Sequence, residues 1–513
     1  MHMNIIVDST IRITNPSADL LEWCKQNLVV TNPDYMKKLK MGFWTGNTPE
    51  MVQFYEVIDS ETEISWSGAE YQTDLAESKV QPGHLDTTLV LPFGLLRKLQ
   101  GMINFSVAQS GFKPIRRVDY GEPVPLYDYQ QKAVSEALEG GYGIIQSPAG
   151  SGKTQMGIAL TKELGRTTLW LTTTKDLLKQ SMERAERYMD KKLIGTITGG
   201  KVKIGEGITF ATIQTMSKLN LDEYKHFWDC IIVDECHHVA GTANSATMFY
   251  RVLNGLSARH KYGLSATVHR ADGMIKATFA LIGDIICTVP KEAVADRVLP
   301  VGIVQVQTPM EMPENFIDCE KLDYSKFINA LCEDEDRNHV ILETIMKNRD
   351  HSCLILSDRL AHLEGLMTAL PSDMADKAVM ISGKMTTKKE KAARDKAIEQ
   401  MRSGEKHYLF ASYNLAKEGL DIPRLERLFM ATPQKDYAVV VQSVGRIARN
   451  FYGKADPVAY DFVDGNIGMM IGMARKRARI YMENNCFFMK EGDGDDSEGT
   501  GGTAENIPWC PRK

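Results

Sequence analysis

The sequence predicts an α/β protein in which two parallel-sheet domains follow a smaller N-terminal domain of mixed helices and strands. From about residue 120, short apolar runs rich in β-branched residues alternate with helical stretches, which is typical of parallel sheets covered by helices. These runs form two series that are separated somewhere between about 290 and 335. The first series is 143–147, 167–172, 208–212, 230–235 and 262–267, and the second is 353–357, 378–382, 408–412, 427–432 and 458–464.

The length of 513 residues exceeds what one hydrophobic core usually organises, and it favours about three domains. We expect an N-terminal accessory domain over 1–118 and two parallel-sheet domains over 119–295 and 296–485. The rest of the chain, 486–513, is expected to be a disordered tail, because its acidic, glycine-rich sequence has no hydrophobic periodicity.

Composition narrows the class of protein. Hydrophobic residues make up 43% and charged residues 25% of the chain, as in soluble globular proteins. No apolar run is long enough to span a bilayer and the N-terminus lacks a signal layout, so we expect a cytoplasmic protein without a membrane partner. The nine cysteines show no zinc spacing, and the net charge of -5 means that any basic surface must be regional.

The clearest motif is SPAGSGKT, which follows an apolar strand and opens a helical pattern. Glycines at such a turn let backbone N–H groups face phosphate oxygens at a helix N-terminus. We expect Lys153 to reach the β and γ phosphates of ATP and the Thr154 hydroxyl to bind Mg²⁺. The strict pattern begins with glycine, where this chain has Ser147. The expected nucleotide-binding residues here are Ser147, Pro148, Ala149, Gly150, Ser151, Gly152, Lys153 and Thr154.

A second motif, DECHH, ends another predicted strand. Its carboxylates are expected at the carboxyl edge of the sheet, where ligands of open α/β sheets bind. Asp234 would hold Mg²⁺, and Glu235 would orient and deprotonate the attacking water. His237 and His238 have no partners at zinc spacing, so we expect coupling or structural roles for them.

In their order along about 330 residues, these motifs resemble those of the superfamily 2 helicases of the DExH type. The resemblance implies two tandem RecA-like domains. Within LYDYQQKAV, it implies adenine contacts by Tyr127 and Gln130. Within TTTKDLLKQ, GG and TIQT it implies nucleic-acid contacts by Thr174, Gly200, Thr212 and Thr215, and in the second domain by Ser382, Gly383 and Ser412.

Two further motifs imply coupling between hydrolysis and motion. SATVHRADG resembles the Ser-Ala-Thr motif and its XPB-type continuation, and it implies coupling roles for Ser265, Thr267, Arg270 and Asp272, beside His237. ASYNLAKEGLDIP implies that Gly419 and Asp421 contact the nucleotide. In QSVGRIAR, helical spacings of four and three would place Gln442, Arg446 and Arg449 on one face, which would deliver arginine to the γ-phosphate.

The first domain adds a narrower resemblance. NPDYMKKLKMGFWTG and LPFGLLRKL resemble segments of phage UvsW-type helicases, which implies a domain that grips duplex or junction DNA. Phe43 and Trp44 could stack on DNA, although core packing is the commoner fate of aromatic residues.

The leading prediction is an ATP-dependent DNA helicase or translocase that acts in recombination, repair or replication in a bacterial or phage-infected cell and works as a monomer. The rivals within the same enzyme class are an RNA helicase and a restriction-type duplex translocase. A rival of another class is an ATP-gated nucleic-acid clamp with little turnover. Two basic stretches, 384–396 and 474–481, could contact phosphates or could be solvated helix faces.

Overall fold

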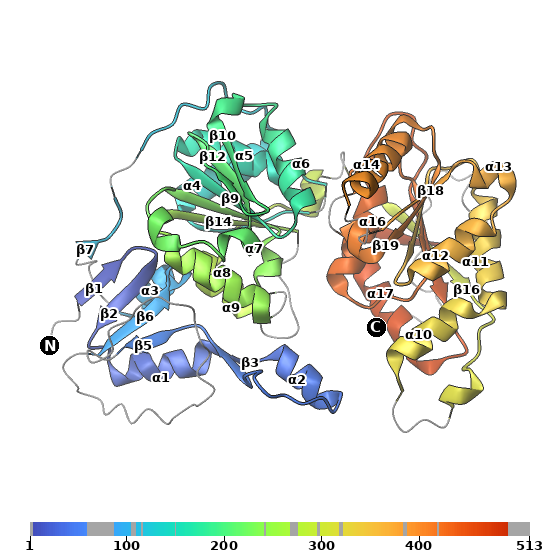
Figure 1. The fold of residues 1–513 in the computed structure, drawn as a ribbon, viewed down its shortest axis with the longest axis horizontal. Helices are drawn as coiled ribbons and strands as arrows, with labels where there is room; N and C mark the ends of the chain where they lie inside the picture. Colours follow the sequence, from blue (N-terminus) through green and yellow to red (C-terminus); the bar gives the residue numbers. More distant parts are fainter. Residues whose placement is uncertain are drawn as a thin grey trace. The chain divides into compact units, whose positions relative to one another are not determined.

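The computed structural model describes residues 4–58, 87–103, 109–113, 116–148, 150–240, 243–266, 275–294, 298–317, 322–382, 387–417 and 420–490. The chain forms two compact units, of which the first holds Met1–Pro148 and Gly152–Pro290 and the second is built on Lys291–Lys513. Figure 1 shows the units coloured along the sequence. No helix in the described part of the chain is both long and apolar enough to cross a membrane.

The N-terminal part of the first unit is a five-stranded sheet in the order β5-β6-β2-β1-β7. Its strands are β1 (Asn4–Val7), β2 (Thr10–Thr14), β5 (Glu56–Ile58), β6 (Thr88–Pro92) and β7 (Gln109–Ser110). The flanking helices are α1 (Ala18–Asn27) and α3 (Leu96–Met102). A hairpin formed by β3 (Val29–Thr31), α2 (Pro33–Lys40) and β4 (Met51–Gln53) extends from this sheet (Figure 1). The core of this domain includes Ala277 and Ala280, so the domain packs directly on the larger sheet domain of its unit.

That larger domain has an eight-stranded sheet in the order β11-β10-β12-β9-β13-β14-β8-β15, parallel except for β11. The strands are β8 (Gly143–Gln146), β9 (Thr168–Thr172), β10 (Ile194–Thr198), β11 (Lys201–Lys203), β12 (Ile208–Thr212), β13 (Cys230–Asp234), β14 (His260–Ser265) and β15 (Ile285–Thr288). The helices include α4 (Asp128–Gly140), α5 (Lys153–Leu164), α6 (Lys175–Ala185), α7 (Ile213–Met216), α8 (Ala243–Gly255) and α9 (Ile275–Ile282). All five predicted strands are present, whereas β10, β11 and β15 were not predicted.

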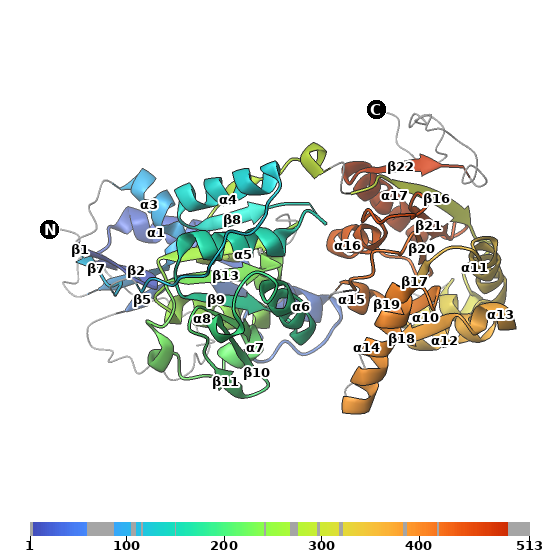
Figure 2. The ribbon, with the colours of Figure 1, turned by 90° about the horizontal axis from the view of Figure 1, so that it is seen from above.

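The second unit holds a seven-stranded parallel sheet in the order β18-β19-β17-β20-β21-β16-β22 (Figure 2). The strands are β16 (Val301–Gln307), β17 (Cys353–Ser357), β18 (Ala378–Ile381), β19 (Tyr408–Ser412), β20 (Arg427–Met430), β21 (Val458–Val463) and β22 (Cys486–Met489). The helices include α10 (Tyr324–Glu333), α11 (Glu335–Lys347), α12 (Leu360–Thr368), α14 (Lys388–Ser403), α15 (Tyr413–Lys417), α16 (Tyr437–Ile447) and α17 (Gly468–Glu483).

Strand β22 corrects the expected start of the disordered tail at residue 486. Cys486 pairs with Val301 and Met489 pairs with Val304, so this segment completes the sheet. Its short apolar run CFFM carries no helical or alternating pattern that separates it from the acidic residues that follow, so composition alone placed the boundary too early.

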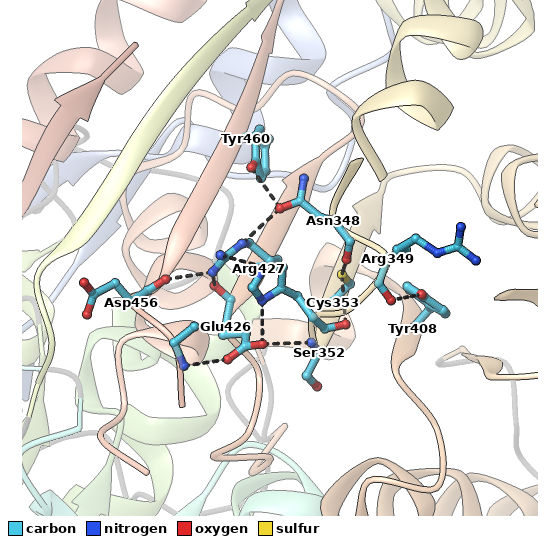
Figure 3. Close-up of polar contacts among 11 residues, drawn as sticks. Asn348, Arg349, Ser352, Cys353, Tyr408, Glu426, Arg427, Asp456 and Tyr460 are labelled. Atoms are coloured by element: carbon cyan, nitrogen blue, oxygen red, sulfur yellow. Dashed lines mark hydrogen bonds and ion pairs between the residues drawn. The ribbon is translucent and has the colours of Figure 1, made fainter. Parts of the chain in front are cut away.

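A polar network holds the amino-terminal edge of the second sheet together (Figure 3). The Arg427 guanidinium donates to Asn348 Oδ1 at 3.0 Å and to the Asp456 carbonyl at 2.7 Å. The neighbouring Glu426 carboxylate accepts from the backbone N–H groups of Ser352 at 3.2 Å and of Ala455 at 2.9 Å. These bonds fix the starts of β17, β20 and β21 and leave the opposite edge to loops.

Candidate functional site

Three adjacent strands of the first unit deliver the chemically important motifs to one sheet edge. In the order β13-β14-β8, Asp234 pairs with Leu264, and Leu264 pairs with Ile145. Because the strands are parallel, the residues after each strand emerge on the same side. The phosphate-loop motif, Ser265 and the DECHH motif therefore meet at the carboxyl edge.

The phosphate loop takes the backbone form that its glycines predict. Gly150 has φ +82°, and Gly152 has φ +82° and ψ +35° as the N-cap of α5. The positive φ of Gly152 favours glycine, and a Cβ there would also displace the amide nitrogen of Gln130. Lys153 and Thr154 then open the helix, whose first N–H groups have no helical acceptor and can face an anion.

Lys153 and the DECHH acids lie next to one another. Lys153 Nζ is 3.8 Å from Glu235 Oε1, and both side chains are largely shielded from solvent. Glu235 has φ +48°, a left-handed conformation that non-glycine residues adopt mainly where the surroundings impose it, often at functional sites. The Ser181 hydroxyl on α6 donates to Asp234 Oδ2 at 3.2 Å and fixes the other acid.

The two acids have opposite electrostatic environments. Burial and the adjacent negative charge of Glu235 raise the pKa of Asp234, against the effect of Lys153. Burial acts upward on Glu235 as well, but the Lys153 ammonium and His237 outweigh it and lower the pKa of Glu235. Glu235 is therefore ionised at neutral pH and can accept a proton or a hydrogen bond from water.

A chain of contacts links the three motifs. The Ser147 N–H donates to the Ser265 carbonyl at 2.9 Å, and the Ser265 hydroxyl lies 3.1 Å from His237 Nδ1. The same ring nitrogen is 3.3 Å from Glu235 Oε2. These contacts connect the phosphate loop, Ser265 and the DECHH motif.

The residues expected to contact adenine lie beside the phosphate loop. Gln130 is buried, and its Oε1 accepts the Tyr127 N–H at 3.1 Å. The Tyr127 ring is 45% exposed and stacks with Tyr129 at a centroid distance of 6.0 Å. The Tyr127 ring is therefore partly exposed, whereas the Gln130 side chain lies against the loop at Gly152.

The residues expected at the nucleic-acid face lie at or just after the carboxyl ends of β10, β12 and β9, which are neighbours in the sheet. Thr174 caps α6, because its hydroxyl accepts the Leu177 N–H at 3.2 Å. The Thr212 and Thr215 hydroxyls lie 2.9 Å apart, and Thr212 is buried. Gly200 has φ +78° in the exposed turn between β10 and β11.

Two contacts in these regions were not predicted. Gln214 Nε2 donates to the Thr173 carbonyl at 2.8 Å and ties the loops after β12 and β9 together. The other is the Ser181 contact with Asp234. Ser181 directly follows the TTTKDLLKQ motif, but no spacing rule indicates which acid its helix faces.

In the second unit, Ser382 follows β18 and Ser412 is the last residue of the neighbouring strand β19, so both lie at the carboxyl edge. The expectation that Gln442, Arg446 and Arg449 share one helical face is wrong for Arg449, because α16 ends at Ile447. Arg449 instead pairs with Val298 in an isolated bridge. Gln442, Arg446 and Arg449 therefore lie on one continuous segment of the chain but not on one helical face.

Both arginines nonetheless meet the segment that carries Asp421. The Arg446 guanidinium donates to the Leu420 carbonyl at 2.9 Å, and the Arg449 guanidinium forms an ion pair with Asp421. Gln442 Oε1 is buried without a hydrogen-bond partner among the described residues. The predicted site residues Ala149, Thr267, Arg270, Asp272, Gly383 and Gly419 lie outside the described residues.

Comparisons with known protein families match both sheet domains. Residues 123–270 match the family described as Type III restriction enzyme, res subunit. Residues 336–451 match the helicase conserved C-terminal domain.

Three curated relatives resemble this chain. A protein of Acanthamoeba polyphaga mimivirus named as an ATP-dependent RNA helicase is 28% identical over 65% of this chain and 62% of its own length. Helicase D10 of Escherichia phage T5 is 26% identical over 66% of this chain and 72% of its own. DNA 3'-5' helicase XPB of Mycobacterium tuberculosis is 27% identical over 58% and 53%. The matched region spans less than two thirds of the mimivirus and mycobacterial proteins.

Among solved structures, S. cerevisiae Dbp5 bound to RNA and ADP BeF3 matches with a TM-score of 0.54 and 17% identity, over 78% of this chain and 94% of that one. This likeness confirms the predicted α/β fold with tandem RecA-like domains. T4 UvsW aligns over 96% of this chain and 99% of its own with 17% identity, but its TM-score of 0.38 is too low to assign a common fold.

Proposed function

We propose that this chain, a superfamily 2 helicase by its two matched domains, uses ATP hydrolysis to translocate on and remodel duplex or branched DNA. The observation that carries the proposal is the shielded pair of Lys153 and Glu235 beside buried Asp234, at the sheet edge that also carries the phosphate loop. A site of this form can hold a triphosphate and activate water next to its terminal phosphate.

The chain's own residues divide the chemistry among them. The N–H groups at Gly150, Gly152 and the start of α5 would bind the phosphates, and Lys153 would neutralise the β and γ oxygens. Glu235 would orient the attacking water and accept its proton. Arg446 and Arg449 would stabilise the charge that develops on the γ-phosphate when the second lobe closes.

The residues also fit Mg²⁺. Asp234 is a buried carboxylate and Thr154 is a hydroxyl at the start of α5, and both are oxygen donors of the kind that Mg²⁺ prefers. When bound, Mg²⁺ would neutralise part of the negative charge of the phosphates. Asp234 and Thr154 are the residues that would hold it there.

The preference for DNA is supported by relatives. XPB of Mycobacterium tuberculosis is named a DNA helicase, and a second relative comes from phage T5. The T5 relative also supports action in the cytoplasm of an infected bacterial cell, and we propose a monomer that acts in repair or recombination. RNA is the competing candidate substrate, because the mimivirus relative is named an RNA helicase.

An ATP-gated clamp with little turnover is the candidate of another class. A clamp needs nucleotide binding but no residue that activates water. Here Glu235 lies 3.8 Å from Lys153, where it can reach a water molecule beside a bound phosphate, and this position supports turnover over gating alone.

The experiment is a comparison of ATPase rates in Mg²⁺ with single-stranded DNA, blunt duplex, a four-way junction, single-stranded RNA and no nucleic acid. We expect duplex or junction DNA to stimulate hydrolysis most. Equal stimulation by RNA would favour the RNA helicase, and slow turnover that no nucleic acid stimulates would favour the clamp. Displacement of a labelled strand from a fork, with and without ATP, would separate a motor from a DNA-stimulated ATPase that does not remodel DNA.

A further inference from the structure

The hairpin between β3 and β4 exposes an unusual set of side chains for its size. Large hydrophobic side chains are open to solvent at Leu39, Met41, Phe43, Trp44 and Met51, and Trp44 is 82% exposed. Helix α2 of this hairpin buries none of its residues. Core packing, the commoner fate of such aromatic residues, is therefore not their role, and an exposed apolar cluster usually marks a binding surface.

The backbone of the hairpin is closed by a single buried residue. Asn32 caps α2 by accepting the Asp34 N–H at 3.0 Å, and its side-chain nitrogen donates to the Pro49 carbonyl at 2.8 Å. Its backbone N–H also donates to the Glu50 carbonyl at 2.8 Å. These bonds connect the two ends of the segment between Asn32 and Glu50, which carries Phe43 and Trp44.

The Trp44 ring lies over the backbone of Gly46. The ring covers Gly46 so closely that a Cβ at that position would overlap it, and Gly46 has φ +34°. The ring therefore rests on backbone with one face, while the large exposed fraction leaves the other face available. Gly46 thus leaves room for the flat Trp44 ring to lie against the backbone.

The lysines near the Trp44 ring favour a negatively charged ligand. Between Lys37 and Pro49 the chain has three lysines, Lys37, Lys38 and Lys40, and no acidic residue. Lys37 and Lys40 are exposed, whereas Lys38 Nζ donates to the Thr48 hydroxyl within the hairpin. A cavity of ≈ 660 Å³ beside Trp44 is lined by two lysines, Lys37 and Lys38, by one acid, Asp34, and by Met41, Phe43 and, from α8, Thr247, among others. Its size is in the range of pockets that take small ligands, and one nucleotide fits such a space.

We propose that this hairpin binds an unpaired nucleotide, with the base stacked on Trp44 and the backbone phosphates near Lys37 and Lys40. An aromatic face flanked by positive charge recognises any base, because every base has a π face and every nucleotide carries a phosphate. The inference rests on the proposed DNA motor and names the element that holds a separated strand at a fork or junction.

The test compares the full-length parent with the variants Trp44→Ala, Trp44→Phe and Tyr452→Ala. Tyr452 is 99% exposed in the second unit and serves as the matched control for loss of a surface aromatic residue. Each protein is titrated with a blunt duplex and with a fork that carries 2-aminopurine at the first unpaired positions. Both affinities are measured at one salt concentration, because phosphate contacts depend on salt.

We expect Trp44→Ala to lower the affinity for the fork relative to the duplex by roughly 5- to 100-fold, the range of base stacking on an aromatic side chain. The stacking-induced fluorescence change of 2-aminopurine should disappear with it. Trp44→Phe should restore most of both signals, and Tyr452→Ala should behave as the parent. Gly46→Val should resemble Trp44→Ala, because it displaces the ring while leaving the residue present.

An unchanged ratio of fork to duplex affinity in Trp44→Ala would overturn the inference. So would a variant that loses self-association in sedimentation while it keeps the ratio, because the cluster would then bind a second copy of the chain. The parent's DNA-stimulated ATPase separates the two proposals. If it is present while the Trp44 variants have no effect, the hairpin inference alone fails, and if it is absent, the proposed DNA motor fails.

Discussion

Lys153 Nζ lies 3.8 Å from Glu235 Oε1, and the two side chains retain only 10% and 22% of their solvent exposure. Lys153 opens α5, which comes after β8, and Glu235 directly follows β13; β14 lies between these two strands in the sheet. The contact means that the cation expected to bind phosphate and the acid expected to activate water share one shielded space. A triphosphate bound in this space would pair with Lys153 in place of Glu235. The Glu235 carboxylate would then be available to accept a hydrogen bond from the attacking water.

Replacing Glu235 with Gln should separate binding from hydrolysis. The amide keeps the shape but cannot accept a proton, so we expect DNA-stimulated kcat to fall by roughly 10² to 10⁴ while ATP affinity stays within a few-fold of the parent. Steady-state ATPase assays and titration with a fluorescent nucleotide measure the two effects. Glu139→Gln, an exposed change on α4, is the control, and a Glu235→Gln enzyme as fast as this control would remove Glu235 from the reaction.

Lys261 should make stability depend on pH. It is buried and donates to the Ser9 carbonyl at 3.0 Å and the Leu253 carbonyl at 2.6 Å, so it joins the N-terminal domain to the larger sheet domain. Burial lowers its pKa to about 7, and Asp8 opposes that shift only partly. In the unfolded chain its pKa is about 10.4.

Between pH 7 and pH 10 the unfolded chain therefore holds this proton more tightly than the folded protein, and the Lys261 contribution to the free energy of unfolding rises with pH. Below pH 7 both states are protonated and the penalty is complete. Urea unfolding at pH 6.5, 8 and 9 should show a smaller rise in stability for Lys261→Met than for the parent. Lys132→Met, at an exposed position, should keep the parent's slope, and equal slopes in all three proteins would contradict the assignment.

Features set by residues close together in the sequence could be predicted, whereas features set by contacts between distant residues could not. The phosphate loop and DECHH were predictable because each is a short motif at the end of an apolar strand, where local pattern and sheet topology agree. The end of α16 before Arg449 was not predictable, because Arg449 joins a bridge to Val298, far away in sequence. The exposure of Trp44 was also hidden, since composition does not reveal whether an aromatic residue finds a core.

In the basic stretch at 474–481, the sequence also did not show which of the charged residues of one helix is buried. Its charges were expected either to face solvent or to contact phosphates, yet Arg477 is fully buried on α17. Its guanidinium forms a 2.8 Å ion pair with Asp461 and donates to the Gln434 carbonyl at 2.9 Å. Arg475, Lys476 and Arg479 of the same stretch are exposed.

Removal of Arg477 should therefore destabilise the second unit. Arg477→Met leaves the buried Asp461 carboxylate without its cation, and we expect a loss of about 3–5 kcal/mol in the free energy of unfolding. Arg475→Met, on the exposed side of the same helix, should change it by about 0.5 kcal/mol or less. Urea unfolding followed by circular dichroism measures both, and a similar effect in the two variants would show that the buried pair contributes nothing specific.

We propose that two separate lobes serve one ATP molecule, with Lys153 from the first and Arg446 and Arg449 from the second. The most direct test is the rate constant of ATP hydrolysis at saturating DNA for Arg446→Ala and Arg449→Ala, beside the exposed control Arg479→Ala. We expect the rate to fall by a factor on the order of 10³ to 10⁵ in at least one of the two variants, with ATP still bound and the fold intact. Rates within tenfold of the control in both variants would contradict it.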